Sequence, residues 1–402
     1  MLKTDKKVQT HTLPLRTKNG STRRQILQIV REERAVSRAE IARRLQLSRP
    51  TASRIVDTLE QDGLIAYTSK SAPTGGRLGE LYSFREDAGV VLGLDLGTRV
   101  ARAAIANLYG EILKRTSRSL SLEKSEDVLS QIDLLVQDML KVCPEAANRI
   151  LALGVAVPGV IHTTPVPGYV DAAKVFPGLN NRPLRDELEQ MLGIPVAIDN
   201  DVNLATLGEY QSGCAQGMSD VTYLFVGRGI GAGLLIERKL VRGHLGGAGE
   251  AGNMVVDRVN LYHGFGGRGC LEAMASIDRL VAASQAAGTP LPSAEAVCER
   301  AVAGEQWACE AIHTMNEYLA ATIINLVAIT DPEIVVLGGD LSELPGANEL
   351  FVKPIQQLIE QHTGCTSPVQ LSQLQGDAAL YGTLQSAIDR ALDVIEQPAL
   401  HG

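Results

Sequence analysis

The sequence lacks several features that mark whole classes of protein. No apolar run approaches the roughly 18 residues that cross a bilayer, and the N-terminal stretch has no apolar core of a secretion signal. The six cysteines are scattered without paired spacing, which is typical of reduced thiols and not of a disulfide framework. These absences argue against a membrane-spanning or disulfide-stapled protein, and we expect a cytoplasmic one.

An overall excess of positive charge is also missing, since the net charge is −8. That value alone argues against a nucleic-acid partner, but the charge is unevenly distributed. Residues 1–85 carry a net charge of +9, whereas residues 86–402 carry −17. A basic head on an acidic body is typical of a DNA-binding module fused to a domain that does not bind DNA. A length of 402 residues is also enough for two or three domains.

Residues 37–61 contain two short helical patterns around a tight turn. Ser37 and Glu40 have the spacing of a capping box. Ser48 precedes the second helix, and Pro50 lies in its first turn, where a missing N–H costs nothing. A helix-turn-helix is the interpretation we favour, although a helical hairpin with a polar face would show the same pattern. The predicted DNA-contacting face carries hydroxyl and guanidinium groups, which suit phosphates and base edges, on Arg49, Thr51, Ser53 and Arg54.

Two strand patterns follow this second helix, at residues 64–67 and 81–84. A loop joins them, as in the wing of a winged helix-turn-helix. We therefore expect such a domain over residues 21–87, after a flexible basic tail at residues 1–20. Glycine at the loop tip lets the backbone approach DNA, and an arginine there can enter a narrow minor groove; an ordinary hairpin with a solvated arginine is the alternative. The tip residues are Gly75, Gly76 and Arg77.

The remaining residues, 88–402, alternate between strand and helix patterns. The first pattern, from Val90, is strand, tight turn, strand, and residues 220–240 repeat it with a glycine-rich turn. Such a repeat indicates an internal duplication, and we expect two α/β lobes with a cleft between them. Glycine turns between strands present bare N–H groups that suit phosphate, although a single glycine turn is as often structural. The possible phosphate-binding residues are Asp95, Gly97, Thr98, Gly227, Gly229 and Gly231.

Four polar residues are candidates for sugar contact. Asn200 and Asp201 follow a buried strand, so that Asp201 can take a proton from a hydroxyl group; either can instead cap the next helix. Glu250 and Glu272 lie in an irregular glycine-rich segment. Their carboxylates can accept hydrogen bonds from sugar hydroxyls, or they can be solvated loop acids.

The chain resembles the ROK family (repressor, open reading frame, kinase). The motifs LDLGT, VAVPG, IDNDVN, LGE, GRGIGAG, GEAGN, GCLEA and VVLGGD occur in family order, and the helix-turn-helix resembles the head of ROK repressors. The resemblance implies an actin-like, two-lobed sugar-kinase fold behind a winged helix-turn-helix. It also implies that Asn200, Asp201, Glu250 and Glu272 converge on one sugar, with Asn253 touching or supporting it.

The resemblance further implies a zinc site that this sequence has lost. In the family, a histidine follows Gly-Glu-x-Gly, and cysteines follow in Cys-x-Cys-Gly-x-x-Gly-Cys. Here Asn253 stands at the histidine, His263 and Phe265 stand at two of the cysteines, and Cys270 remains. Phenylalanine cannot ligate a metal, and an amide is a poor zinc ligand. We therefore predict no metal.

Two other departures concern nucleotide and sugar. Arg228 replaces the small hydroxyl residue usual in the second phosphate loop, where it can fill the phosphate space or pair with phosphate. Val175 stands where an asparagine often contacts the sugar. These changes put ATP–Mg²⁺ binding in doubt, and we expect no cofactor.

Together these features predict a sugar-responsive transcriptional regulator, a repressor of carbohydrate-utilisation genes. Its expected partners are double-stranded operator DNA, a sugar or sugar derivative, and further copies of the chain in a homodimer or higher oligomer. The sugar must bind one of two states better for release to follow. The kinase-like body is expected to be non-catalytic, with Asp201 a vestigial base. The alternatives are an active sugar kinase that also binds DNA, and a sensor sequestered by a sugar-transport component.

Overall fold

The computed structural model describes residues 22–70, 79–85, 87–97, 100–119, 128–164, 166–171, 177–257, 268–364 and 367–396. The chain divides into two compact units. The first comprises Met1–Gly89 together with Leu392–Gly402, and the second comprises Val90–Ala391. No helix among the described residues is long and apolar enough to cross a membrane.

The first unit is a winged helix-turn-helix, as predicted. Three helices pack around apolar side chains that include Leu27, Ile41 and Val56, all fully buried. A small antiparallel sheet completes the unit, with strand order β1-β3-β2. The predicted tail at residues 1–20 lies outside the described residues. The elements are α1 (Thr22–Glu33), β1 (Val36–Ser37), α2 (Arg38–Arg44), α3 (Arg49–Gln61), β2 (Ile65–Lys70) and β3 (Glu80–Phe84).

Local capping explains where the two helices of the motif begin. Ser37 Oγ accepts a hydrogen bond of 3.2 Å from the backbone N–H of Glu40, and Ser48 Oγ accepts one of 3.2 Å from Thr51. Each bond satisfies a backbone donor that the helix itself leaves unpaired. Gly63 follows α3 with φ of +73°, a conformation that glycine adopts without strain.

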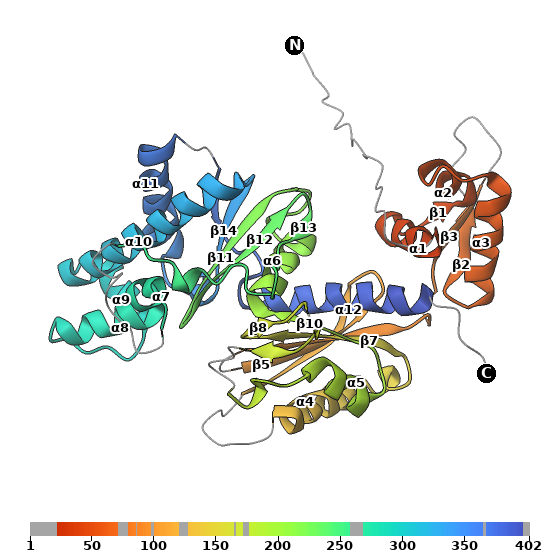
Figure 1. Ribbon diagram of the computed structural model, residues 1–402, viewed down its shortest axis with the longest axis horizontal. Helices are drawn as coiled ribbons and strands as arrows, with labels where there is room; N and C mark the ends of the chain where they lie inside the picture. Colours follow the sequence, from red (N-terminus) through yellow and green to blue (C-terminus); the bar gives the residue numbers. More distant parts are fainter. Residues whose placement is uncertain are drawn as a thin grey trace, which may run out of the picture. The chain divides into compact units, whose positions relative to one another are not determined.

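The first lobe of the body is a five-stranded sheet with order β10-β7-β4-β5-β6. Strand β4 lies in the middle, antiparallel to β5 and parallel to β7. Alternate residues such as Leu92 and Leu94 pack against α4 and α5 on one face (Figure 1). The elements are β4 (Val90–Leu96), β5 (Val100–Asn107), β6 (Ile112–Ser119), α4 (Val128–Val142), η1 (Pro144–Ala146), β7 (Ile150–Val157), β8 (Val160–Ile161), β9 (Val170–Asp171), η2 (Pro177–Leu179), α5 (Leu184–Leu192) and β10 (Val196–Asn200).

The second lobe has a five-stranded sheet of order β13-β12-β11-β14-β15. Helices α7 to α11 cover one face, and α6 packs on the other face against Tyr223 and Val336. The elements are α6 (Asp201–Ser212), β11 (Val221–Val226), β12 (Ile230–Ile236), β13 (Lys239–Leu240), η3 (Ala251–Asn253), α7 (Cys270–Ala275), α8 (Ile277–Ala286), α9 (Ala294–Val302), α10 (Gln306–Thr330), β14 (Ile334–Gly338), η5 (Asp340–Glu343), η6 (Asn348–Val352), α11 (Lys353–Thr363), β15 (Val369–Leu371), η7 (Gln375–Asp377) and α12 (Ala378–Glu396).

The two sheets have the same topology. Numbered within each lobe, both run 3-2-1-4-5, with strands 1 and 4 parallel and strands 1 and 2 antiparallel. This repeat agrees with the predicted duplication, and the architecture is the actin-like, two-lobed sugar-kinase fold. Strands β8, β9 and β15 and helix α11 were not predicted.

Close packing of helices α6 and α12 depends on glycine. Helix α12 lies on the face of the first sheet opposite α4 and α5 (Figure 1). A Cβ at Gly154 on β7 would lie 2.0 Å from the carbonyl oxygen of Thr383. A Cβ at Gly208 would lie 2.0 Å from the Ala378 carbonyl, and one at Gly382 would lie 1.8 Å from Leu204. No side chain fits at these positions, so the backbones touch.

Candidate functional site

The predicted DNA-contacting face begins at the N-terminus of α3. Arg49 and Arg54 are exposed, and Thr51 and Ser53 are half-buried. The Thr51 hydroxyl lies 2.7 Å from Ser48 Oγ, so it takes part in the cap. Within the described part of the chain, neither Arg49 nor Arg54 has a carboxylate partner. Their guanidinium groups are therefore available to an external anion.

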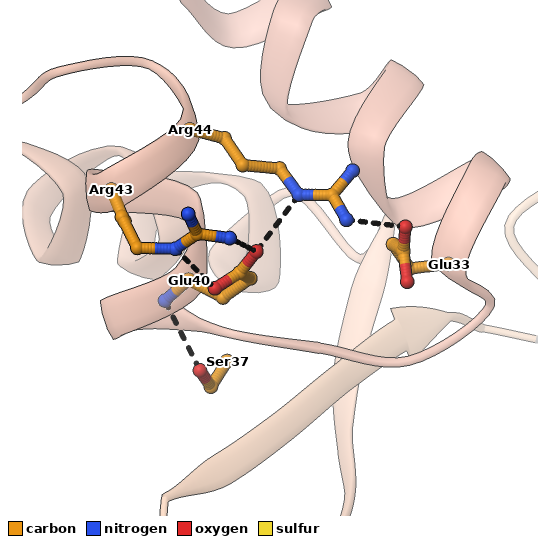
Figure 2. Close-up of polar contacts among 5 residues, drawn as sticks. All are labelled: Glu33, Ser37, Glu40, Arg43 and Arg44. Carbon is orange, nitrogen blue, oxygen red and sulfur yellow. Dashed lines mark hydrogen bonds and ion pairs between the residues drawn. The ribbon is translucent and has the colours of Figure 1, made fainter. Parts of the chain in front are cut away.

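Other arginines of this unit are already neutralised. Glu40 accepts hydrogen bonds from Arg43 and from Arg44, at 2.6 Å and 2.9 Å, as Figure 2 shows. Arg44 also reaches Glu33 on α1 at 2.5 Å. The hydrogen bond from Arg43 is the largest cause that lowers the pKa of Glu40 to about 2. Further ion pairs with carboxylates hold Arg23, Arg24, Arg38 and Arg85.

Arg38 joins helix α3 to strand β3 of the wing. Its Nη1 lies 2.6 Å from Asp57 of α3, and its Nε donates to Tyr82 Oη on β3 at 3.0 Å. The Tyr82 hydroxyl in turn donates to Glu80 at 3.0 Å. This network fixes the wing strands against α3. The predicted tip residues Gly75, Gly76 and Arg77 lie outside the described residues.

The body places Asp95 at the carboxyl end of β4. The residue is only 4 % exposed, and it lies opposite Arg102 of β5, with Oδ2 3.2 Å from Nη1. Burial raises the pKa of Asp95 to about 7, against the opposing effect of Arg102. The negative charges of Asp201 and Asp377 raise the pKa of Asp95 further. Asp201 therefore lies near Asp95. A raised pKa in a buried cluster of this kind is typical of a functional site.

Arg102 is held from a second side by Asp377 in η7. Its Nε lies 3.6 Å from Oδ1 of Asp377, whose Oδ2 also lies 3.1 Å from Arg115. Gly97 borders the same guanidinium group, since a Cβ there would lie 3.7 Å from Nη1 of Arg102. The first predicted phosphate turn therefore adjoins an arginine that two carboxylates hold. Thr98 of that turn lies outside the described residues.

Asn200 caps α6, which was one of the two alternatives for this residue. Its Oδ1 accepts from the backbone N–H groups of Val202 and Asn203 at 2.9 and 3.1 Å, and its Nδ2 donates to the Gly159 carbonyl at 3.0 Å. These bonds use both lone pairs of the amide oxygen and leave one amide hydrogen for a ligand.

Asp201 occupies the first position of α6. Withdrawal from water raises its pKa to about 6, and the negative charge of Glu250 adds to the rise. A hydrogen bond from the Val202 backbone opposes it. Asp201 and Glu250, which are far apart in the sequence, therefore lie near each other. A carboxyl group that titrates near pH 6 can accept a proton or a hydroxyl hydrogen bond at neutral pH.

Glu272 on α7 lies against the second glycine turn and against η3. A Cβ at Gly229 would lie 3.5 Å from its Oε2, and a Cβ at Gly252 would lie 3.4 Å from it. Asn253 is exposed at the end of η3, and Cys270 is buried at the start of α7. Asp201 and Glu250 are thus close enough to interact electrostatically, and Glu272 lies beside the second glycine turn.

That second turn, between β11 and β12, is closed by a hydrogen bond of 2.9 Å from Gly227 N–H to the Gly229 carbonyl. Gly231 packs on α6, where a Cβ would lie 3.0 Å from Val202. Arg228 is 59 % exposed, and its Nε lies 4.0 Å from Asp278 of α8. The sequence indicated that Arg228 fills the phosphate space or pairs with phosphate, and Asp278 was not predicted as a partner.

The metal prediction rests on residues of which only part is described. His263, Phe265 and the sugar-contact position Val175 lie outside the described residues. Elsewhere, in the ranges that the structure does describe, no group of three or more His, Cys, Asp or Glu side chains could hold a metal ion. The absence of zinc therefore stays a prediction.

Sequence reasoning missed four charged residues of this region: Arg102, Asp377, Asp199 and Arg242. Arg102 gave a signal, because it is a charged residue in the otherwise apolar strand pattern VARAAIAN. Asp199 lies within the motif IDNDVN but drew no attention beside Asn200. The partners Asp377 and Arg242 are remote in sequence, and nothing local marks them.

Comparison with known proteins gives the same division of the chain. The profile of the ROK family matches residues 91–390, and a profile described as winged helix-turn-helix DNA-binding matches residues 21–66. The xylose repressor of Caldicellulosiruptor bescii is 30 % identical over 393 residues, which cover 92 % of this chain and 96 % of the repressor.

Solved structures show the same fold. A ROK family transcriptional regulator, described as a homologue of the Escherichia coli MLC protein, superposes with a TM-score of 0.77 at 21 % identity, covering 93 % of this chain and 97 % of its own. A ROK family glucokinase from Streptomyces griseus, in complex with glucose and AMPPNP, has a TM-score of 0.62 at 25 % identity. It covers 75 % of this chain and all of its own.

Proposed function

Because the chain belongs to the ROK family and carries a winged helix-turn-helix, we propose that it is a transcriptional repressor whose operator binding is controlled by a sugar. The DNA-binding unit recognises duplex DNA in the cytoplasm, and the body binds the sugar between its lobes. The sugar favours a state of the protein that binds DNA less well. A homodimer would present two α3 helices to half-sites one helical turn apart.

One observation carries this proposal. Arg49 and Arg54 at the exposed start of α3 have no carboxylate partner among the described residues, while neighbouring arginines are ion-paired. Exposed, unpaired guanidinium groups on the recognition helix suit phosphate oxygens and guanine edges.

The body supports sugar binding more than phosphoryl transfer. Asp201 and Glu250 supply carboxylates that can accept hydroxyl hydrogen bonds, as a sugar requires. Asp95, the carboxylate available to Mg²⁺, is already bound to Arg102. Phosphoryl transfer needs Mg²⁺ and phosphate held together, and we therefore propose a sensor in place of a catalyst.

The similar xylose repressor suggests D-xylose as the first sugar to test. The glucokinase was solved with glucose, so glucose is the second. Both are neutral polyols, which the carboxylates Asp201 and Glu250 would bind as hydrogen-bond acceptors. Other aldoses and their derivatives complete the panel.

The test begins with selection of binding sites from a random duplex library by the full-length protein. Fluorescence anisotropy then gives the affinity for the selected duplex, with and without each sugar. We expect the selected duplex to bind with a Kd on the order of 10 nM or below, weakened by one sugar of the panel. Failure to select any sequence would overturn the repressor, and unchanged affinity with every sugar would overturn the sugar control. Turnover of ATP that depends on a sugar would favour the kinase alternative.

A further inference from the structure

Residues 241–250, here called the strap, run from the end of β13 to Glu250. Both ends of the strap are fixed to the second lobe. The backbone N–H of Val241 donates to Leu234 at 2.8 Å, and that of Ala232 on β12 donates to Gly249 at 2.7 Å. Gly249 has a φ of +90°, and a Cβ there would lie 1.9 Å from the Ala232 carbonyl oxygen. The end that carries Glu250 is therefore pressed against β12.

The middle of the strap crosses to the first lobe. The hydroxyl groups of Thr163 and Thr164 both donate to the His244 carbonyl at 3.1 Å. A Cβ at Gly246 would lie 1.9 Å from the carbonyl oxygen of Ile161 on β8. The strap backbone thus touches both lobes within ten residues.

One ion pair reinforces this crossing. Arg242 Nε donates to Oδ2 of Asp199 at 2.7 Å. The other oxygen, Oδ1, accepts from the Asn200 backbone at 2.8 Å and from Asn203 Nδ2 at 3.1 Å. Asp199 is only 5 % exposed, and a buried carboxylate needs a cation as well as hydrogen bonds. Arg242 is that cation, and its own side chain remains 41 % exposed.

The Arg242–Asp199 ion pair links the two segments that carry Asp201 and Glu250. Asp199 lies two residues before Asp201, and Arg242 lies on the strap, which ends at Glu250. Asp201 and Glu250 carry like charges and lie close enough to perturb each other, so they repel. This repulsion must be opposed when no sugar is bound, and the Arg242–Asp199 pair adds to the hydrogen bonds at His244 and Gly249 that hold the strap.

We propose that Arg242 is a positioning residue for the sugar: by binding Asp199, it holds the strap so that Glu250 and Asp201 face the same ligand. The inference rests on the proposed sugar-binding function. Loss of the ion pair leaves the middle of the strap with the two threonine hydrogen bonds at His244, so the strap is held more loosely against the repulsion of the two carboxylates. The sugar must then order the strap as it binds, and the free energy of this ordering weakens its affinity.

The test compares sugar affinity and strap mobility in four proteins: wild type, Arg242→Gln, Asp199→Asn and the double variant. Calorimetry with the sugar selected above measures affinity, and hydrogen exchange without sugar measures the protection of amides in the strap. Lys239→Gln is the matched control, because it removes an exposed positive charge on the adjacent strand β13.

We expect each single variant to bind the sugar about tenfold or more weakly, the scale of one charged hydrogen bond. The double variant should be no weaker than either single one, since both remove the same interaction. Arg242→Lys should restore part of the affinity. Exchange should quicken within the strap and stay unchanged in β11 and β14, a local pattern that a general loss of stability would not give.

The outcomes separate the two hypotheses. Equal sugar affinity in wild type and Arg242→Gln, additive losses in the double variant, or unchanged exchange of the strap would overturn the positioning role alone. Wild-type protein that binds no sugar of the panel would overturn the proposed function and the positioning role with it.

Discussion

The guanidinium group of Arg102 and the carboxylate of Asp95 form an ion pair across adjacent strands, with 3.2 Å between Nη1 and Oδ2. Asp377 holds the same guanidinium group from another side. Mg²⁺ in a nucleotide site is commonly bound by one or two carboxylates. Arg102 already holds one oxygen of Asp95, and its positive charge would repel Mg²⁺ bound to the other, so the ion pair disfavours a metal ion at this carboxylate.

We therefore expect the wild-type protein to show no sugar-dependent consumption of ATP. A coupled assay of ADP release, with Mg²⁺–ATP and each sugar of the panel, measures it. Asp201→Asn is the control, because it removes the carboxylate predicted to take a proton from the sugar hydroxyl. Turnover in the wild type that disappears in Asp201→Asn would contradict the prediction and establish a kinase.

Arg49→Ala and Arg54→Ala should each weaken binding to the selected duplex by about 1–3 kcal/mol if they contact bases. A phosphate contact would instead lower the slope of log affinity against log salt by about 1. Anisotropy titrations at several salt concentrations measure both quantities.

Arg43→Ala provides the matched control for the DNA experiment. Arg43 is 73 % exposed on α2, but it is bound to Glu40. Its removal should change DNA affinity less than removal of Arg49 or Arg54. Equal losses in all three variants would show that net charge, and not the face of α3, determines binding.

Gly154→Ala should destabilise the body by about 1–3 kcal/mol, the usual cost of overpacking. The new Cβ would lie 2.0 Å from the Thr383 carbonyl oxygen, so β7 and α12 must move apart. Urea unfolding measures the change in midpoint. Gly247→Ala is the control, because no atom lies within 4 Å of its Cβ, and it should be nearly neutral. A neutral Gly154→Ala would mean that α12 shifts freely on the sheet.

What could be predicted from the sequence was mostly local. The caps at Ser37 and Ser48 and the turn at Gly63 depend on residues three or four positions apart, and the structure confirms all three. Strand β1 was missed because its two residues are strand only through pairing with Tyr82 and Leu81 of β3. A strand of two residues is too short to show the alternation of buried and exposed side chains from which strands are predicted.

The candidate site was less predictable because its contacts join distant stretches. The pair of Asp95 and Arg102 follows from the register of β4 and β5, which no local pattern reveals. Arg242 and Asp199 lie 43 positions apart on different lobes. The family resemblance placed Asp201 and Glu250 in one site, and the fold brings the two residues, which are remote in sequence, near each other.

Zinc should be absent from the purified protein. Asn253 is exposed in η3, at the position of the histidine ligand, and an amide does not replace an imidazole. Elemental analysis of protein prepared without chelator measures the metal content. One equivalent of zinc per chain, lost in Cys270→Ser, would contradict the prediction and show that Cys270 recruits other ligands.

Sugar affinity should fall as the pH is lowered from 7 to 5. A neutral sugar does not titrate, so any change belongs to the protein. The pKa of Asp201 is raised to about 6, first by burial and then by Glu250. Only the ionised form offers two acceptor oxygens, and apparent affinity scales with its fraction. That fraction falls from about nine-tenths at pH 7 to about one-tenth at pH 5, so the apparent Kd should rise about tenfold. Calorimetry between pH 5 and 8 measures the profile. Asp201→Asn should bind more weakly but with the same affinity at both ends of this range; a tenfold change that persists in Asp201→Asn would assign the titration to another carboxyl group of the site.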